Sequence, residues 1–264
     1  MPSIARQDVH VPTPQGRLFA RRWDPAGRDV DAAPIVLLHD SLGCVELWRD
    51  FPERLAMATG RAVIAYDRLG FGRSDPNPAT LATGFVEAEA DGGFQDLRRA
   101  LDIGPFIAFG HSVGGGMGIC CAAAHPADCR ALITESAQTF AEDRTLDGIR
   151  AAQRNFAEPG QLDRLKKYHG DKAAWVLSAW VDTWLSPAFA QWNLDDALRR
   201  VQCPVLALHG EEDEYGSTAH PGIIARLAGG RQALLENCGH VPHREQPHIV
   251  LDLTSQWLRG ALPG

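Results

Sequence analysis

A pentapeptide near the middle of the chain carries a residue type suited to nucleophilic chemistry. Residues 110–114 read Gly110-His111-Ser112-Val113-Gly114, between an apolar run at 105–109 and a run of small residues at 115–124. In a tight strand-to-helix turn, flanking glycines let the backbone bend and the helix pack closely, while the serine hydroxyl is exposed at the edge of the sheet. The pattern therefore predicts that Ser112 is a nucleophile.

A serine hydroxyl needs a general base, and the base needs an acid that fixes its tautomer. Asp213 closes the string His209-Gly210-Glu211-Glu212-Asp213, and His240 lies in Asn237-Cys238-Gly239-His240-Val241-Pro242. Each string follows a run typical of a buried strand, so both side chains are expected at strand ends, beside Ser112. We predict that Asp213 and His240 complete a catalytic triad with Ser112.

Other residues could take the roles of acid and base. Glu135 also follows a strand-like run and is the second candidate for the acid, and His243 is the rival base, although Pro242 before it favours the start of a helix. His111 precedes the nucleophile and should point away from it, in a structural or pocket-shaping role. The acidic neighbours of Asp213 could also replace it: Glu211, Glu212 and Glu214.

Acyl transfer also needs two donors aimed at the developing negative charge. The backbone N–H of Val113, directly after the nucleophile, is the first expected donor. The second should come from the loop after the apolar run 34–39, which reads His39-Asp40-Ser41-Leu42-Gly43-Cys44. The backbone N–H of Ser41 is the best candidate there, and Leu42 is expected to border the substrate pocket.

The surrounding pattern alternates strand-like and helix-like segments, which favours a mostly parallel sheet with ligands at the carboxyl ends of its strands. Two short strands near Val9 and Leu18 precede six buried ones, for eight in all. The later strands are expected at 34–39, 61–67, 105–109, 130–135, 203–209 and 231–236. Helices are expected at 47–59, 87–101, 115–124 and 249–258.

Residues 137–200 interrupt this alternation with successive short helical segments. The sequence thus predicts a core domain of 1–136 and 201–264 and a helical cap of 137–200. The cap holds four of the seven tryptophans, Trp175, Trp180, Trp184 and Trp192. These side chains could simply attach the cap, but sites between domains favour ligands, and Trp180 and Trp184, one helical turn apart, are the best candidates to line an apolar pocket.

Composition and charge limit the possible functions. The chain has 264 residues, 45% of them hydrophobic, and a net charge of −7, which disfavours nucleic acid and anionic membranes as partners. The start shows no secretory pattern, and no run of 18 apolar residues occurs, so a cytoplasmic protein is expected. Six cysteines without C-x-x-C spacing indicate reduced thiols, and neither a metal nor a cofactor is expected. A homodimer is compatible with the sequence, which does not determine the oligomeric state.

With the string Asp67-Arg68-Leu69-Gly70-Phe71-Gly72-Arg73-Ser74 and the stretch from Trp48 to Pro52, the chain resembles the α/β-hydrolase superfamily along nearly its whole length. It is most similar to capped serine hydrolases: small esterases, lactonases and C–C bond hydrolases. The family usually has His-Gly where this chain has His39-Asp40. Aspartate tolerates left-handed backbone, and its charge would make the oxyanion hole less electropositive. We therefore expect Asp40→Gly to change the catalytic rate more than the stability.

The resemblance implies hydrolysis of a small, largely apolar carboxylic ester or lactone through an acyl-enzyme on Ser112. A C–C bond hydrolase for a diketone-type product of aromatic degradation would use the same residues. A ligand sensor with little turnover, from a different functional class, would also preserve them. Relatives that use an aspartate nucleophile are excluded by Ser112, and the prolyl aminopeptidase elbow Gly-Gly-Ser-Trp-Gly differs at His111 and Val113.

Overall fold

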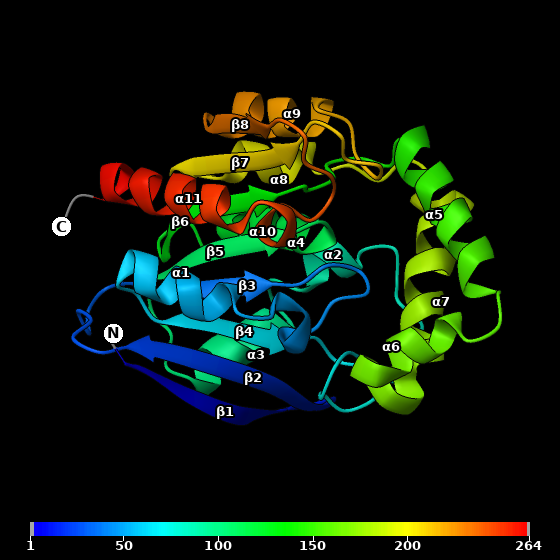
Figure 1. Ribbon diagram of the computed structural model, residues 1–264, viewed down its shortest axis with the longest axis horizontal. Helices are drawn as coiled ribbons and strands as arrows, with labels where there is room; N and C mark the ends of the chain where they lie inside the picture. The colour runs from blue at the N-terminus through cyan, green and yellow to red at the C-terminus, as the bar shows by residue number, and fades with distance from the viewer. Residues whose placement is uncertain (1–2, 263–264) are drawn as a thin grey trace.

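The computed structural model describes residues 3–262 and is built around one eight-stranded sheet (Figure 1). The strand order is β1-β2-β4-β3-β5-β6-β7-β8; β1 and β2 are antiparallel to their neighbours, and the other pairs are parallel. The strands are β1 (Ile4–Thr13), β2 (Gly16–Pro25), β3 (Ile35–Leu38), β4 (Val63–Asp67), β5 (Phe106–His111), β6 (Cys129–Glu135), β7 (Val205–Gly210) and β8 (Arg231–Leu235). The predicted eight-stranded, mostly parallel α/β sheet is confirmed.

Helices cover both faces of the sheet because the central strands are apolar on both sides. In β3, Val36 and Leu38 pack into one hydrophobic cluster and Ile35 and Leu37 into the other, as the two-residue period of a strand requires. The first cluster includes side chains of α2 (Phe85–Ala88), α3 (Gly93–Ala100), α4 (Val113–Ala124), α8 (Asp195–Arg200) and α9 (Ala219–Ala228). The second includes side chains of α1 (Phe51–Thr59) and α11 (Pro247–Ala261). Within residues 3–262, every helix is too short or too polar to cross a bilayer.

The segment between β6 and β7 is helical. It contains α5 (Asp143–Phe156), α6 (Gln161–His169), the 3₁₀ turn η2 (Gly170–Lys172), α7 (Ala173–Trp184) and the 3₁₀ turn η3 (Pro187–Phe189). Figure 1 shows α5, α6 and α7 gathered beyond the tips of the strand arrows, at the right of the view. The predicted cap range also includes α8, which instead packs against α4 and α9 in the core layer.

Two predicted helices differ in detail from the structure. The segment 87–101 is divided into α2 and α3 by a turn at residues 89–92, which ends at Gly92, the N-cap residue of α3. Glycine is a poor residue inside a helix and is well suited to this position. The segment 47–59 begins earlier, as the 3₁₀ turn η1 (Val45–Trp48), and α1 follows with Pro52 in its first turn. A short helix, α10 (Pro242–Glu245), begins at the proline that follows His240 and Val241.

Candidate active site

Ser112 occupies a strained turn between β5 and α4. Its φ of 57° and ψ of −127° lie outside the usual regions for a non-glycine residue. The two flanking glycines are required by space: a Cβ on Gly110 would lie 2.1 Å from the carbonyl oxygen of Gly114, and a Cβ on Gly114 would lie 2.1 Å from that of Leu38. Close packing of α4 on β3 and β5 thus holds the elbow in its strained form.

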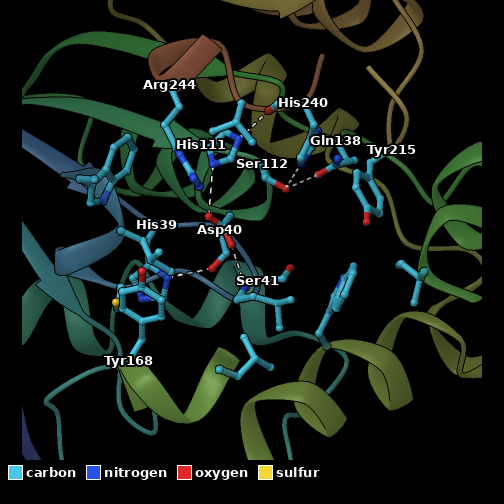
Figure 2. A pocket seen from close by; sticks show the side chains of 18 of the residues that line it. His39, Asp40, Ser41, His111, Ser112, Gln138, Tyr168, Tyr215, His240 and Arg244 are labelled. Atoms are coloured by element: carbon cyan, nitrogen blue, oxygen red, sulfur yellow. Dashed lines mark hydrogen bonds and ion pairs between the residues drawn. The ribbon is translucent and has the colours of Figure 1, made fainter. Parts of the chain in front are cut away.

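The structure brings Ser112, His240 and Asp213 together from three separate strand ends (Figure 2 shows the first two). The Ser112 hydroxyl lies 3.0 Å from His240 Nε2. His240 Nδ1 lies 2.8 Å and 2.9 Å from the two carboxylate oxygens of Asp213. This is the hydrogen-bond chain by which a base withdraws the serine proton while an acid fixes the base's tautomer.

Asp213 is buried and held as an ionised carboxylate by its loop. Its Oδ1 also accepts the backbone N–H groups of Tyr215 at 2.8 Å and Gly216 at 3.0 Å. Burial opposes ionisation, but the hydrogen bond from His240 and the nearby histidine charges outweigh it, so the pKa of Asp213 lies below its usual value. The negative charge that would stabilise a protonated His240 is therefore in place.

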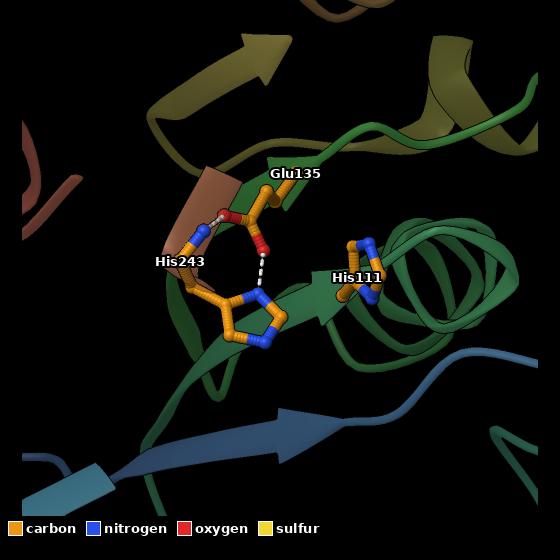
Figure 3. Close-up of side chains that lie close together, drawn as sticks. All are labelled: His111, Glu135 and His243. Carbon is orange, nitrogen blue, oxygen red and sulfur yellow. Dashed lines mark hydrogen bonds and ion pairs between the residues drawn. The ribbon is translucent and has the colours of Figure 1, made fainter. Parts of the chain in front are cut away.

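Glu135, the second candidate for the acid, pairs with His243, the second candidate for the base (Figure 3). One Glu135 oxygen lies 2.6 Å from His243 Nδ1, and the other accepts the His243 backbone N–H at 2.5 Å. Glu135 thus supports α10, and His240 takes its acid from Asp213. None of the three acidic neighbours of Asp213 has a hydrogen bond to His240 in the described chain.

Glu135, His243 and His111 are also the residues with the spacing of a metal site, since their ligand atoms lie within 4.8 Å of one another. The Glu135 oxygens already bond to His243, and His111 Nε2 lies 2.7 Å from the carbonyl oxygen of His240. A bound ion would have to displace these contacts. The cluster is therefore a buried polar support beneath the elbow and α10.

The loop that carries Ser41 follows β3, and the other predicted donor, Val113, directly follows Ser112 at the start of α4. Ser41 lines the cavity in front of Ser112. The Val113 amide opens α4, so it has no acceptor within the helix. The loop keeps its shape without left-handed backbone at Asp40, which is not among the positive-φ residues of the described chain. Its carboxylate instead accepts the backbone N–H of Leu42 at 2.8 Å.

Asp40 forms an ion pair with a buried histidine. Its Oδ2 lies 3.4 Å from His111 Nδ1, and the His111 side chain is only 2% exposed (Figure 2). Burial disfavours a charged imidazole, but the carboxylates of Asp40 and Glu135 outweigh it and raise the pKa of His111 to about 9. In turn, His111 helps to hold the pKa of Asp40 well below its usual value, against the effect of burial. The negative charge of Asp40 is thus offset by a protonated His111.

A cavity of about 300 Å³ opens in front of Ser112, between the sheet and the helices of residues 137–200. All four predicted pocket residues line it: Leu42, His111, Trp180 and Trp184. Trp175 packs against Phe71, and Trp192 stacks on Phe189, so neither reaches the cavity. Further lining residues were not predicted from the sequence: Gln138, Thr145, Ile149, Arg164, Tyr168, Tyr215 and Arg244.

Gln138 is the most significant of the missed residues. Its Oε1 lies 3.3 Å from the Ser112 hydroxyl, which can therefore donate its single proton either to Gln138 or to His240. The side chain is buried and follows β6, where Ser136 has a positive φ of 48°. A lone glutamine after a strand carries no motif, so no signal in the sequence identifies it.

The helices over the cavity are attached to the loops that form its floor. His169, at the end of α6, accepts the backbone N–H of Gly72 at 2.9 Å and lies 3.0 Å from the carbonyl oxygen of Leu42. On the other side, Arg144 donates to the carbonyl oxygen of Asp213 at 3.0 Å. Arg144 thus joins α5 to the loop that carries Asp213, and His169 joins α6 to the loop that carries Leu42.

Comparison with known proteins identifies the family. The model of the alpha/beta hydrolase family matches residues 35–253. The chain belongs to the alpha/beta hydrolase family. The six strands β3 to β8, the elbow, and the residues Ser112, Asp213 and His240 lie within the matched range.

Several characterised proteins resemble this alpha/beta hydrolase. It is 28% identical to the human protein "Serine hydrolase BPHL" over 79% of this chain and 73% of the relative. It is 24% identical to a proline iminopeptidase of Lactobacillus crispatus (strain ST1), over 88% of this chain and 92% of the relative. A carboxylesterase structure from Nitrososphaera gargenis matches 96% of this hydrolase and 98% of that chain, with a TM-score of 0.76 and 19% identity. One of these proteins is named an iminopeptidase and another a carboxylesterase, so their names do not agree on one substrate class.

Proposed function

We propose that this alpha/beta hydrolase is a serine hydrolase that cleaves a small carboxylic ester or lactone through an acyl-enzyme. The observation that carries the proposal is the 3.0 Å contact between the Ser112 hydroxyl and His240 Nε2, with Asp213 bonded to the opposite ring nitrogen. The strained conformation of Ser112 adds support, because it presents the hydroxyl to the cavity.

In the proposed reaction, His240 removes the Ser112 proton as the Ser112 oxygen attacks the substrate carbonyl. The backbone N–H groups of Ser41 and Val113 stabilise the oxyanion. Protonated His240, stabilised by Asp213, then gives its proton to the leaving alcohol, and the ester C–O bond breaks. Water, deprotonated by His240, attacks the acyl-enzyme; the acid leaves and Ser112 regains its proton.

The cavity favours a small, largely apolar substrate. Its walls include Ile149, Trp180 and Trp184, whereas its reactive end holds Ser112 and Gln138. A volume of about 300 Å³ is at the lower limit of ordinary ligand pockets, which suits a short acyl group and a small alcohol better than a polymer.

The test is a substrate panel with wild type and Ser112→Ala. The panel contains 4-nitrophenyl acetate, butyrate and octanoate, γ-lactones, a 1,3-diketone and proline 4-nitroanilide. We expect turnover of short esters or lactones and a loss of at least about 10³-fold in kcat in Ser112→Ala. Ser178→Ala is the matched control, because that hydroxyl donates to the Trp175 carbonyl outside the cavity, and its loss should leave kcat unchanged.

Other outcomes would replace the proposal. Ester turnover that survives in Ser112→Ala would exclude the acyl-enzyme on this residue. A single burst of product without further turnover would indicate a ligand-trapping protein. Cleavage of only the diketone or only the proline anilide would assign the site to that bond type.

A further inference from the structure

The side-chain oxygen of Gln138 shares the Ser112 proton with His240. Gln138 lines the cavity and is 2% exposed, and its Oε1 lies 3.3 Å from the Ser112 hydroxyl. The same hydroxyl lies 3.0 Å from His240 Nε2, and Figure 2 shows both bonds starting at the Ser112 oxygen. Within residues 3–262, this hydroxyl is the only donor to Gln138 Oε1. One proton thus serves two acceptors.

The backbone on either side of Gln138 is tied to neighbouring elements. Two residues before it, the N–H of Ser136 donates to the carbonyl oxygen of Leu208 in β7 at 2.9 Å. One residue after it, the carbonyl oxygen of Thr139 accepts the N–H of Leu194, the residue before α8, at 2.8 Å. Gln138 is therefore presented to Ser112 from a segment that β7 and α8 hold in place.

Formation of an acyl-enzyme would remove the donor from both acceptors. In the proposed reaction the Ser112 proton passes to His240 and leaves with the alcohol, so the esterified Ser112 oxygen carries no hydrogen. Gln138 Oε1 and His240 Nε2 are then two acceptors that have lost the same donor, and a buried acceptor without a donor is costly. The described chain holds no other donor for Oε1, so a replacement must enter the cavity from outside.

We propose that Gln138 positions the water that hydrolyses the acyl-enzyme. Water has two protons, so it can donate one hydrogen bond to His240 Nε2 and the other to Gln138 Oε1. The inference rests on the proposed ester hydrolysis and concerns its second step. Fixing both O–H groups orients the water oxygen before it attacks the acyl carbon.

The proton balance assigns different tasks to the two acceptors. His240 takes the proton that faces it as the water oxygen bonds to the acyl carbon. The bond between the acyl carbon and Ser112 then breaks, and His240 returns the proton to Ser112. Gln138 gains and loses no proton; it accepts a hydrogen bond from the O–H that remains on the attacking oxygen. Gln138 is thus a positioning residue for the attack.

The test uses methanol as a second nucleophile. Methanol has one hydroxyl proton, which His240 must remove, so it has none left to donate to Gln138. The acyl-enzyme formed from 4-nitrophenyl butyrate divides between butyrate and methyl butyrate at a fixed concentration of methanol. Gln138→Met keeps the length of the side chain but removes the acceptor. We expect hydrolysis to slow about tenfold and methanolysis to change by less than about twofold, so the ratio of methyl butyrate to butyrate should rise about tenfold.

A second readout follows the first step of the reaction. Gln138 competes with His240 for the Ser112 proton, so its removal should not slow acylation. In Gln138→Met, kcat/KM should stay within about twofold of wild type, and the initial burst of 4-nitrophenol should become larger relative to the steady rate. A merely structural role would slow acylation and would slow the reactions with water and methanol alike.

Further variants isolate the acceptor oxygen. Gln138→Leu, which also lacks it, should give the same rise in the product ratio. Gln138→Glu retains an acceptor and should keep the ratio within about twofold of wild type, although its negative charge should slow both reactions. Gln153→Met on α5 is the matched control, because it makes the same change at an exposed position outside the cavity. It should leave kcat and the ratio unchanged.

The outcomes separate this inference from the proposed function. An unchanged ratio in Gln138→Met and Gln138→Leu, with Ser112-dependent turnover, would refute the positioning of water and leave ester hydrolysis standing. An equal rise in Gln138→Glu would show that the acceptor is not responsible and would also refute it. Turnover that survives in Ser112→Ala, or no turnover of any ester, would overturn both proposals.

Discussion

The Nδ1 atom of His111 lies 3.4 Å from Oδ2 of Asp40, while the opposite nitrogen of the same ring lies 2.7 Å from the carbonyl oxygen of His240. One buried imidazole thus joins the loop after β3 to the backbone of His240, the proposed catalytic base. A protonated ring donates Nε2–H to the His240 carbonyl and attracts the Asp40 carboxylate, whose contact with Nδ1 is an ion pair rather than a hydrogen bond. His111 is therefore a positioning residue, and the charge of Asp40 matters through it.

The first prediction concerns the pH dependence of stability. The folded pKa of His111 is raised from 6.5 to about 9, so its stabilising effect is complete below about pH 6.5 and is lost as the pH rises through about 9. The full shift corresponds to about 3 kcal/mol, an upper limit for the part due to Asp40. In urea denaturation, wild type should exceed Asp40→Asn in unfolding free energy at pH 6, and the difference should shrink by pH 9.5.

A matched control for this comparison is Asp75→Asn. Asp75 pairs with Arg17 at the surface, and neither group titrates between pH 6 and pH 9.5. Its effect on unfolding should be small and constant over this range. A difference between wild type and Asp40→Asn that stays constant with pH would contradict a protonated His111.

The second prediction revises the expected effect of Asp40→Gly. Because Asp40 also holds the Leu42 amide and compensates a buried charge, the substitution should lower stability as well as change the rate. We expect both kcat and the unfolding free energy to fall, the latter by about 1–3 kcal/mol. Urea denaturation and ester kinetics measure the two effects; unchanged stability would restore the sequence-based expectation.

The third prediction separates the two candidate acids. Asp213→Asn should lower kcat by about 10⁴-fold, because the amide favours the wrong tautomer of His240. Glu135→Gln should keep kcat within about tenfold and instead destabilise the fold by about 3 kcal/mol, because His243 loses its buried partner. Steady-state kinetics and thermal unfolding measure the two effects, and a reversed pattern would make Glu135 the catalytic acid.

The fourth prediction concerns chain-length selectivity. Trp180→Ala should enlarge the aromatic end of the cavity and shift the preferred acyl chain toward longer esters, since each buried methylene contributes about 0.8 kcal/mol. Trp175→Ala is the control, because Trp175 packs against Phe71 outside the cavity. An ester series from two to twelve carbons measures the shift; identical profiles in wild type and Trp180→Ala would show that this wall does not select the acyl group.

The fifth prediction tests the packing of the elbow. A methyl group at position 114 would lie 2.1 Å from the Leu38 carbonyl oxygen, so Gly114→Ala should yield unfolded or inactive protein. Gly260→Ala on α11 meets no atom within 4 Å and should be neutral or stabilising by about 0.5–1 kcal/mol. Circular dichroism with thermal unfolding compares the two, and a stable, active Gly114→Ala protein would contradict the close approach of α4 to β3.

The sequence predicted the elements whose signal is local. Two-sided apolar runs mark the buried strands, and Gly110 and Gly114 mark the elbow, because a sharp turn admits few residue types there. Asp213 and His240 could be chosen because parallel strands bring their carboxyl ends to one edge of the sheet. The break between α2 and α3 was missed, although Gly92, which ends it, is a residue that disfavours a helix interior.

Only the tertiary structure decided how separate segments meet. Glu135 and Asp213 both follow strands, and which one reaches His240 depends on the path of the loops after β6 and β7. Gln138, Arg164 and Arg244 belong to no motif, and they line one cavity because the segment after β6, α6 and α10 all border the space in front of Ser112. Asp40 was visible as a departure from the family pattern, but its partner was not. An ion pair is a relationship in space, and for Asp40 and His111 it is set by β3 pairing with β5, which brings residues 71 positions apart side by side.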